Sequence, residues 1–156
     1  MSIWLDRLRD DGDDLSPIAD CIDYFEREYG EAAKELAVDG HRLITIESRL
    51  GGITQHRYAQ QQELEAILEY LNIRFNRLKG QRHRFYMEKY DRALSSRDAE
   101  KYADGDDEVM QFAMLINRVA LMRNKFLSIH KGLEVLHYQL TNISKLRAAG
   151  IEDATL

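Results

Sequence analysis

The chain has 156 residues, with a net charge of −5, 31% charged residues, one proline and a single cysteine, Cys21. This length is typical of one domain, and a lone cysteine excludes an intramolecular disulfide framework. The sequence has no apolar run long enough to cross a bilayer and no signal-peptide pattern, so we expect a cytoplasmic protein that does not bind membranes.

Residues 1–52 carry most of the negative charge and are expected to form acidic N-terminal helices. A short amphipathic segment with Trp4 comes first, and we expect this tryptophan to pack rather than to bind a ligand. Ser16 is a good N-cap residue and Pro17 fits the first position of a helix. Gly30 interrupts the apolar stripe of that helix, Asp39-Gly40 marks a second break, and Gly51-Gly52 ends the region.

Residues 53–94 are predicted to form a second and much longer helix, which Thr54 caps. Apolar residues recur along it at steps of three and four, as on the buried face of a helix. Gly80 lies inside this helix and costs about 1 kcal/mol relative to alanine, so we expect either a bend or the close approach of another backbone.

Residues 95–106 are predicted to be a short helical elbow that begins at Ser95-Ser96. Residues 107–150 then form a long C-terminal helix, for which Gly150 is a natural stop. At 1.5 Å per residue, each of the two long helices spans roughly 60 Å.

The predicted fold is all-α and a single helical domain. Two long helices of matched length, joined by a short elbow, favour an antiparallel helical hairpin on which the N-terminal helix packs. The apolar stripe of the last helix is broader than one partner helix covers, which favours self-association into a homo-oligomer. The residues expected at the contact between copies are Phe126, Leu133, Leu136, Leu140, Ile143 and Leu146.

The strongest functional signal is the basic band, residues 74–92, which has a net charge of +5 in an acidic protein. Basic side chains neutralise phosphates and aromatic rings stack on unpaired bases, so the band is typical of a single-stranded nucleic-acid site. A solvated helix face is the competing interpretation. Tyr86 and Tyr90, one turn apart, either stack bases or pack the elbow. The candidate DNA-binding residues are Arg74, Arg77, Lys79, Arg82, Arg84, Phe85, Tyr86 and Lys89.

Signs of catalysis are lacking in the sequence. His130, Glu134 and His137 share one helix face, but a di-iron site needs a second Glu-x-x-His pair, so a polar layer at a helix interface is the favoured interpretation. There is no phosphate-binding glycine loop and no nucleophile elbow. We therefore expect no cofactor, no metal and no enzymatic activity.

Two segments, LSSRDAEKYADGDDEV from Leu94 and LTNISKLRAAG from Leu140, resemble the UvsY-type recombination mediators of bacteriophages. The similarity extends from Leu78 to Gly150. It implies a non-enzymatic accessory protein that binds single-stranded DNA, assembles as a ring, and helps a recombinase replace the single-strand-binding protein. It further implies that the basic band lines the DNA path, that the last helix drives assembly, and that a phage-encoded protein would act in the cytoplasm of its host.

A second hypothesis makes the chain a non-enzymatic coiled-coil adaptor without nucleic acid. Its basic band would then contact an acidic protein partner or the chain's own acidic N-terminal region, residues 1–40.

Overall fold

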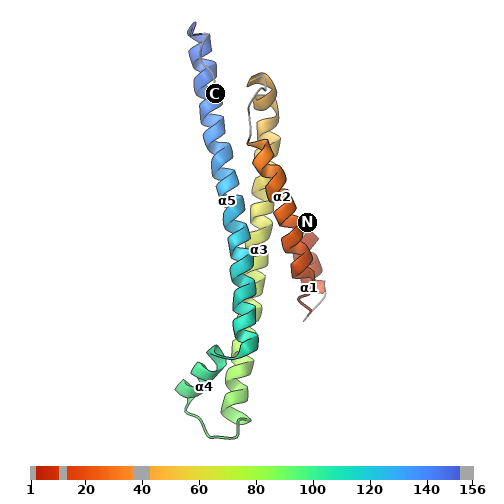
Figure 1. Cartoon of the computed structure of the whole chain (residues 1–156), viewed down its shortest axis with the longest axis vertical. Helices are drawn as coiled ribbons and strands as arrows, with labels where there is room; N and C mark the ends of the chain where they lie inside the picture. The colour runs from red at the N-terminus through yellow and green to blue at the C-terminus, as the bar shows by residue number, and fades with distance from the viewer. Residues whose placement is uncertain (1–2, 11–13, 37–42, 152–156) are drawn as a thin grey trace. The chain divides into compact units, whose positions relative to one another are not determined.

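The computed structural model describes residues 3–10, 14–36 and 43–151. These residues form α-helices and no strand, which confirms the predicted all-α class (Figure 1). The helices are α1 (Ile3–Asp10), α2 (Pro17–Glu35), α3 (Leu43–Glu88), α4 (Ser96–Asp104) and α5 (Asp107–Ala148).

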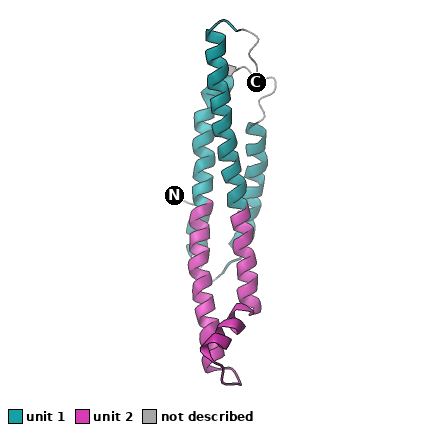
Figure 2. Cartoon of the chain, turned by 90° about the vertical axis from the view of Figure 1, so that its left-hand side faces the viewer, with its two compact units in different colours: residues 1–63, 122–156 teal, residues 64–121 magenta. Residues whose placement is uncertain are grey.

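The chain divides into two compact units, coloured separately in Figure 2. Unit 1 comprises residues 1–63 and 122–156, and unit 2 comprises residues 64–121. Both α3 and α5 contribute to each unit (Figure 2). Within each unit the two helices run antiparallel, as the predicted hairpin requires (Figure 1). Unit 2 also contains the elbow helix α4, and unit 1 contains α1 and α2.

The core of unit 1 is built from α2, α3 and α5. Phe25 of α2 meets Phe126 of α5 edge-on at 5.5 Å between ring centroids, and both side chains are fully buried. Trp4 lies against Tyr24 at 5.7 Å, which confirms that this tryptophan packs. Burial raises the pKa of the Cys21 thiol to about 12, with a smaller contribution from the charge of Glu63, so Cys21 is a small buried hydrophobe.

The predicted break at Gly51-Gly52 is wrong, because α3 begins at Leu43 and runs through both glycines. Leu50 is buried in a cluster against which Ile46 and Ile53 also pack. These three residues are spaced four and three apart and so share one helix face. Their burial outweighs the cost of about 1 kcal/mol for each helical glycine, and Thr54 lies inside the helix instead of capping it.

Gly30 does not interrupt α2 either, since that helix extends from Pro17 to Glu35. The predicted break at Asp39-Gly40 lies outside the described residues. At the other end, α3 stops at Glu88 and not near Leu94, so the last residues of the basic band belong to a loop.

Of the capping residues predicted for the ends of α2, α4 and α5, two take that role through the contacts expected of them and one does not. Ser95 is the predicted N-cap of α4, with its hydroxyl accepting a hydrogen bond from the Asp98 amide at 3.2 Å. Gly150 has a φ of 86° and ends α5, where the Ile151 amide donates to the Leu146 carbonyl. Ser16 does not cap α2 through its side chain.

Candidate nucleic-acid interface

The basic band divides between two faces of α3, because a helix turns 100° per residue. One face carries Lys79, Arg82 and Tyr86, which are spaced three and four apart. The other face carries Arg77 and Arg84, with Phe85 beside them. All of these residues belong to unit 2, and the two faces have different surroundings.

The first face is engaged by the acidic elbow. Lys79 Nζ lies 2.7 Å from Asp104 Oδ1. Arg82 pairs with Glu108 and lies 3.4 Å from Asp106 Oδ1. The hydrogen bond to Glu108, together with the two carboxylate charges, raises the pKa of Arg82 despite the opposing effect of desolvation. These two cations are therefore already neutralised inside the chain.

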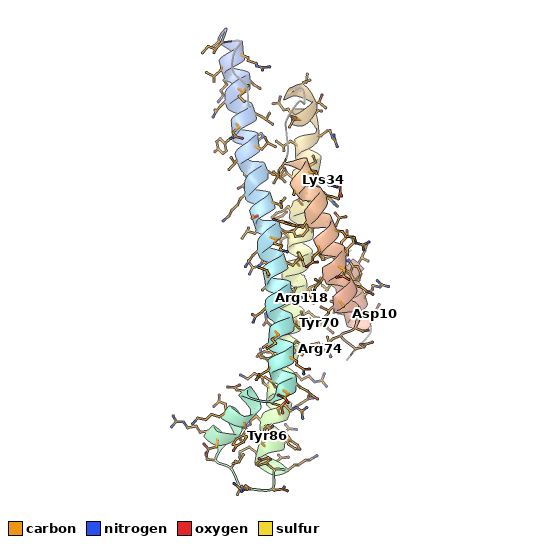
Figure 3. The ribbon with its side chains drawn as sticks, viewed as in Figure 1. Asp10, Lys34, Tyr70, Arg74, Tyr86 and Arg118 are labelled. Atoms are coloured by element: carbon orange, nitrogen blue, oxygen red, sulfur yellow. The ribbon has the colours of Figure 1, made fainter. Side chains whose placement is uncertain are left out.

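Tyr86 completes the contacts at the elbow, where Figure 3 labels it. Its hydroxyl donates to Asp106 Oδ2 at 3.0 Å. Its ring lies 5.4 Å from Tyr90 and 5.7 Å from Tyr102. Burial, the hydrogen bond to Asp106 and the charge of Asp106 raise the pKa of Tyr86. Of the two predicted roles for Tyr86, the contacts correspond to packing of the elbow.

The negative charge that pairs with Lys79 and Arg82 comes from one acidic segment of the sequence. Residues 98–108 contain six acidic side chains and one basic side chain, Lys101. This acidic segment includes Asp104, Asp106 and Glu108, the carboxylates that pair with Lys79 and Arg82. The local positive charge of the first face is thereby largely cancelled.

The second face is open. Arg77 and Arg84 on this face are exposed, as are Lys89 and Arg92 in the loop that follows α3. None of these four side chains makes an ion pair with any residue that the structure describes. Phe85 beside them is 40% exposed. A hollow of about 320 Å³ lies on this face, lined by Gln81, Arg84, Phe85, Glu88 and Lys89.

Gly80 lies between Arg77 and Arg84 on α3. A Cβ placed on Gly80 would meet nothing within 4 Å, so the backbone here is open to a neighbour. Arg74, the first residue of the band, belongs to neither group. Its guanidinium lies over the Tyr70 ring at 5.8 Å, and a nitrogen is 3.4 Å from the Tyr70 hydroxyl (Figure 3).

The residues predicted to join copies of the chain are, with one exception, part of the chain's own core. Leu146 is 43% exposed. The other five predicted residues are buried in unit 1 of the single chain, and self-association through this helix stays a prediction. Their exposed fractions are Phe126 0%, Leu133 1%, Leu136 5%, Leu140 1% and Ile143 7%. Leu133, Leu136 and Leu140 share a buried cluster with Ala32 of α2 and Leu50 of α3. Other apolar residues of α5, such as Leu121 at 59%, stay exposed.

A buried polar network in unit 1 was missed by sequence reasoning. Arg57 is 2% exposed, and its guanidinium lies 2.7 Å from both Glu28 and Glu35 of α2. It also donates to Gln60 Oε1 at 2.8 Å, and Gln60 in turn donates to Glu28. In the sequence, the one hint of this network is a pair of glutamates seven residues apart on α2. The residues around Arg57 do not distinguish it from a surface arginine.

The three residues weighed as a metal site do not form one. His130 Nδ1 lies 3.8 Å from Glu134 Oε1, and the centroid of the His130 ring is 5.3 Å from that of the Tyr58 ring, with the two rings tilted. Within residues 3–10, 14–36 and 43–151, no group of three or more His, Cys, Asp or Glu side chains is placed to hold a metal ion.

Comparison of the chain with protein-family models, curated proteins and solved structures finds no match. The resemblance to recombination mediators therefore stays a prediction that depends on the quoted segments. In the part of the chain that the structure describes, no helix is long and apolar enough to span a membrane.

Proposed function

We propose that the chain is a non-enzymatic accessory protein that binds single-stranded DNA through the exposed face of α3 and the start of the loop that follows it. The observation that carries this proposal is the set of exposed cations, Arg77, Arg84 and Lys89, beside the exposed ring of Phe85. Arginines pair with phosphates in bidentate geometry, and an exposed phenyl ring provides a stacking surface for an unpaired base.

The binding site is narrower than the sequence predicted. Lys79, Arg82 and Tyr86 are engaged by the elbow, so we assign them to its structure and not to DNA. The open backbone at Gly80 would allow a phosphate chain to approach the helix closely between Arg77 and Arg84. The mediator role, in which the protein assists a recombinase against single-strand-binding protein, is the role that the resemblance implies for such a site.

The test is fluorescence anisotropy with labelled single-stranded and duplex oligonucleotides. We expect preferential binding to the single strand, weakening by about 0.7 log unit per neutralised phosphate for each decade of salt. The double variant Arg77→Glu/Arg84→Glu should lose at least tenfold in affinity, with helicity unchanged. Arg97→Glu/Arg118→Glu is the matched control, because it makes the same change of charge at exposed positions of the same unit outside this face.

Equal losses in both double variants would show that only net charge matters and would overturn the assigned site. Absence of binding to either oligonucleotide would remove the DNA-binding function.

The competing function is an adaptor whose basic face contacts an acidic protein. The pairing of Lys79 and Arg82 with carboxylates shows that such contacts form in this unit. Competition between a polyglutamate peptide and the oligonucleotide separates the two functions. Tighter binding of the peptide, at equal charge and ionic strength, would favour the adaptor.

A further inference from the structure

A second surface, in unit 1, is unrelated to the basic band. It is a groove of about 910 Å³ between the beginning of α3 and the C-terminal part of α5. Leu50 and Leu133 line it and are 5% and 1% exposed, so they form its floor. Tyr58 and Tyr138 also line it and are 47% and 72% exposed, so aromatic surface is left open to solvent. The other lining residues are Glu47, Gly51, Thr54, Gln55, His130, Glu134 and His137.

Gly51, which lines this groove, has open space beside it, whereas Gly132 on the facing helix is closely packed. A Cβ on Gly132 of α5 would lie 3.2 Å from Leu36 Cδ1, so that glycine is needed to seat a side chain of the same chain. A Cβ on Gly51 of α3 would meet nothing within 4 Å. Gly52, Gly30 and Gly80 are equally open, but among these four glycines Gly51 alone lines the groove. Its missing side chain deepens the groove at a position where helix propensity favours every other residue except proline.

The charge of the groove selects its occupant. The charged side chains that line it are Glu47, from α3, and Glu134, from α5, and no lysine or arginine is among the lining residues. Each of the two helices that line the groove therefore contributes one carboxylate. An apolar floor between acidic walls fits an occupant with an apolar face and flanking cations.

The dimensions of the groove favour a helix. Its α3 wall extends from Glu47 to Tyr58, which is about three helical turns or roughly 16 Å. Helices in apolar grooves are held by side chains one turn apart on a single face. A segment of three to four turns would cover both floor leucines and reach both glutamates.

We propose that this groove binds an amphipathic α-helix of a partner protein, with its apolar face on Leu50 and Leu133 and its lysine or arginine residues against Glu47 and Glu134. This proposal does not depend on DNA binding, which is assigned to the other unit. The failure of either proposal therefore leaves the other unaffected.

The probe is a labelled helical peptide of about five turns, made of leucine and lysine at amphipathic spacing, titrated with the full chain at physiological ionic strength. A peptide of the same composition in a shuffled, non-amphipathic order controls for attraction to an acidic protein. The test variant is Gly51→Leu, which fills the groove. Gly52→Leu is the matched control, because it adds the same side chain to the next residue of α3, outside the groove.

We expect saturable binding of the amphipathic peptide, at least tenfold tighter than that of the shuffled peptide. Gly51→Leu should weaken binding at least tenfold, Gly52→Leu should leave it within twofold, and Glu47→Gln/Glu134→Gln should weaken it and lower its salt dependence. Circular dichroism checks that all variants keep their helicity. Equal effects of the two leucine substitutions, or equal binding of the two peptides, would overturn the proposal.

Sedimentation of the protein alone separates a partner from a second copy. If the wild-type chain self-associates and Gly51→Leu abolishes that association, the occupant is another copy of this chain, and the proposal of a different partner protein is overturned.

Discussion

The hydroxyl of Tyr86 donates a hydrogen bond to the carboxylate of Asp106, 20 residues later in the chain, at 3.0 Å. The other oxygen of the same carboxylate accepts from the Glu108 amide at 3.1 Å, at the beginning of α5. Asp106 therefore caps α5 and ties α3 to it. One side chain of the elbow thus satisfies a helix end and a tyrosine at once.

Replacing Asp106 should destabilise unit 2 more than replacing its neighbour. Asp106→Ala removes the cap, the acceptor of Tyr86 and a partner of Arg82, and should lower the free energy of unfolding by about 2 kcal/mol. Asp107→Ala makes the same change of charge in the exposed first turn of α5 and should cost about 0.5 kcal/mol. Urea denaturation followed by circular dichroism measures both. Equal losses would mean that the charge near the helix end, and not the hydrogen bonds of Asp106, stabilises the elbow.

Local signals in the sequence predicted the elbow well and the packing of the long helices less well. Ser95 and Gly150 were identified because capping depends on residues one turn away. The continuity of α3 through Gly51 was missed, because it depends on the burial of Leu50 against residues of α5 that lie about 80 positions away.

The same difference between local signals and long-range contacts explains which features of the candidate site the sequence indicated. The sequence indicated a band of cations, but not that Asp104 and Glu108 would engage Lys79 and Arg82. It also indicated a broad apolar stripe on α5, but not that α2 and α3 would bury the part of it that includes Phe126 and Leu133. An apolar stripe is the same whether it packs within one chain or between copies, so sequence alone does not decide between the two.

The burial of that stripe leads to a prediction for Leu133, one of the residues first expected to join copies. Because Leu133 is 1% exposed in the core of unit 1, Leu133→Ala should lower the free energy of unfolding by about 3 kcal/mol. Leu146→Ala, at 43% exposure on the same helix, should cost less than about 1 kcal/mol. Chemical denaturation gives both values. A Leu133→Ala variant of unchanged stability that loses self-association would support the original assignment.

Gly80 offers a prediction that separates stability from binding. Since a Cβ there meets nothing, Gly80→Ala should stabilise α3 by about 1 kcal/mol. A larger residue, as in Gly80→Leu, should keep most of that gain and yet obstruct the approach of a phosphate chain between Arg77 and Arg84. Thermal unfolding and oligonucleotide anisotropy, measured on the same two variants, test this. If Gly80→Leu binds DNA as tightly as the wild type, then the open backbone has no part in binding.

The Arg57 network should be sensitive to loss of its cation. Arg57→Met keeps a side chain of similar length but leaves Glu28 and Glu35 facing each other without a counter-charge. We expect a loss of about 3 kcal/mol, at the lower end for buried pairs because both glutamates retain some exposure. Adding Glu28→Gln and Glu35→Gln to Arg57→Met should recover part of this loss in urea denaturation. No recovery would mean that the packing of Arg57, and not its charge, stabilises the contact between α2 and α3.

Glu28 gives the same network a dependence on pH. Burial alone would raise the pKa of this carboxyl, but hydrogen bonds from Gln60 and Arg57, the charge of Arg57 and a contact with His56 outweigh burial and hold it below its usual 4.5. A depressed pKa in the folded state means that the stabilisation is complete above about pH 4.5. Below that pH the unfolded chain takes up the proton first, so the stabilisation is lost as the pH falls towards the folded pKa.

We therefore expect Glu28→Gln to be less stable than the wild type at pH 7, and the gap between them to narrow as the pH falls through 4.5. Urea denaturation at a series of pH values measures the gap. Glu26→Gln, an exposed glutamate of α2 without an ion pair among the described residues, is the control for the loss of one negative charge. A gap that stays constant from pH 7 to pH 3 would show that Glu28 titrates alike in the folded and unfolded chain. Its hydrogen bonds to Arg57 and Gln60 would then contribute nothing that depends on its charge.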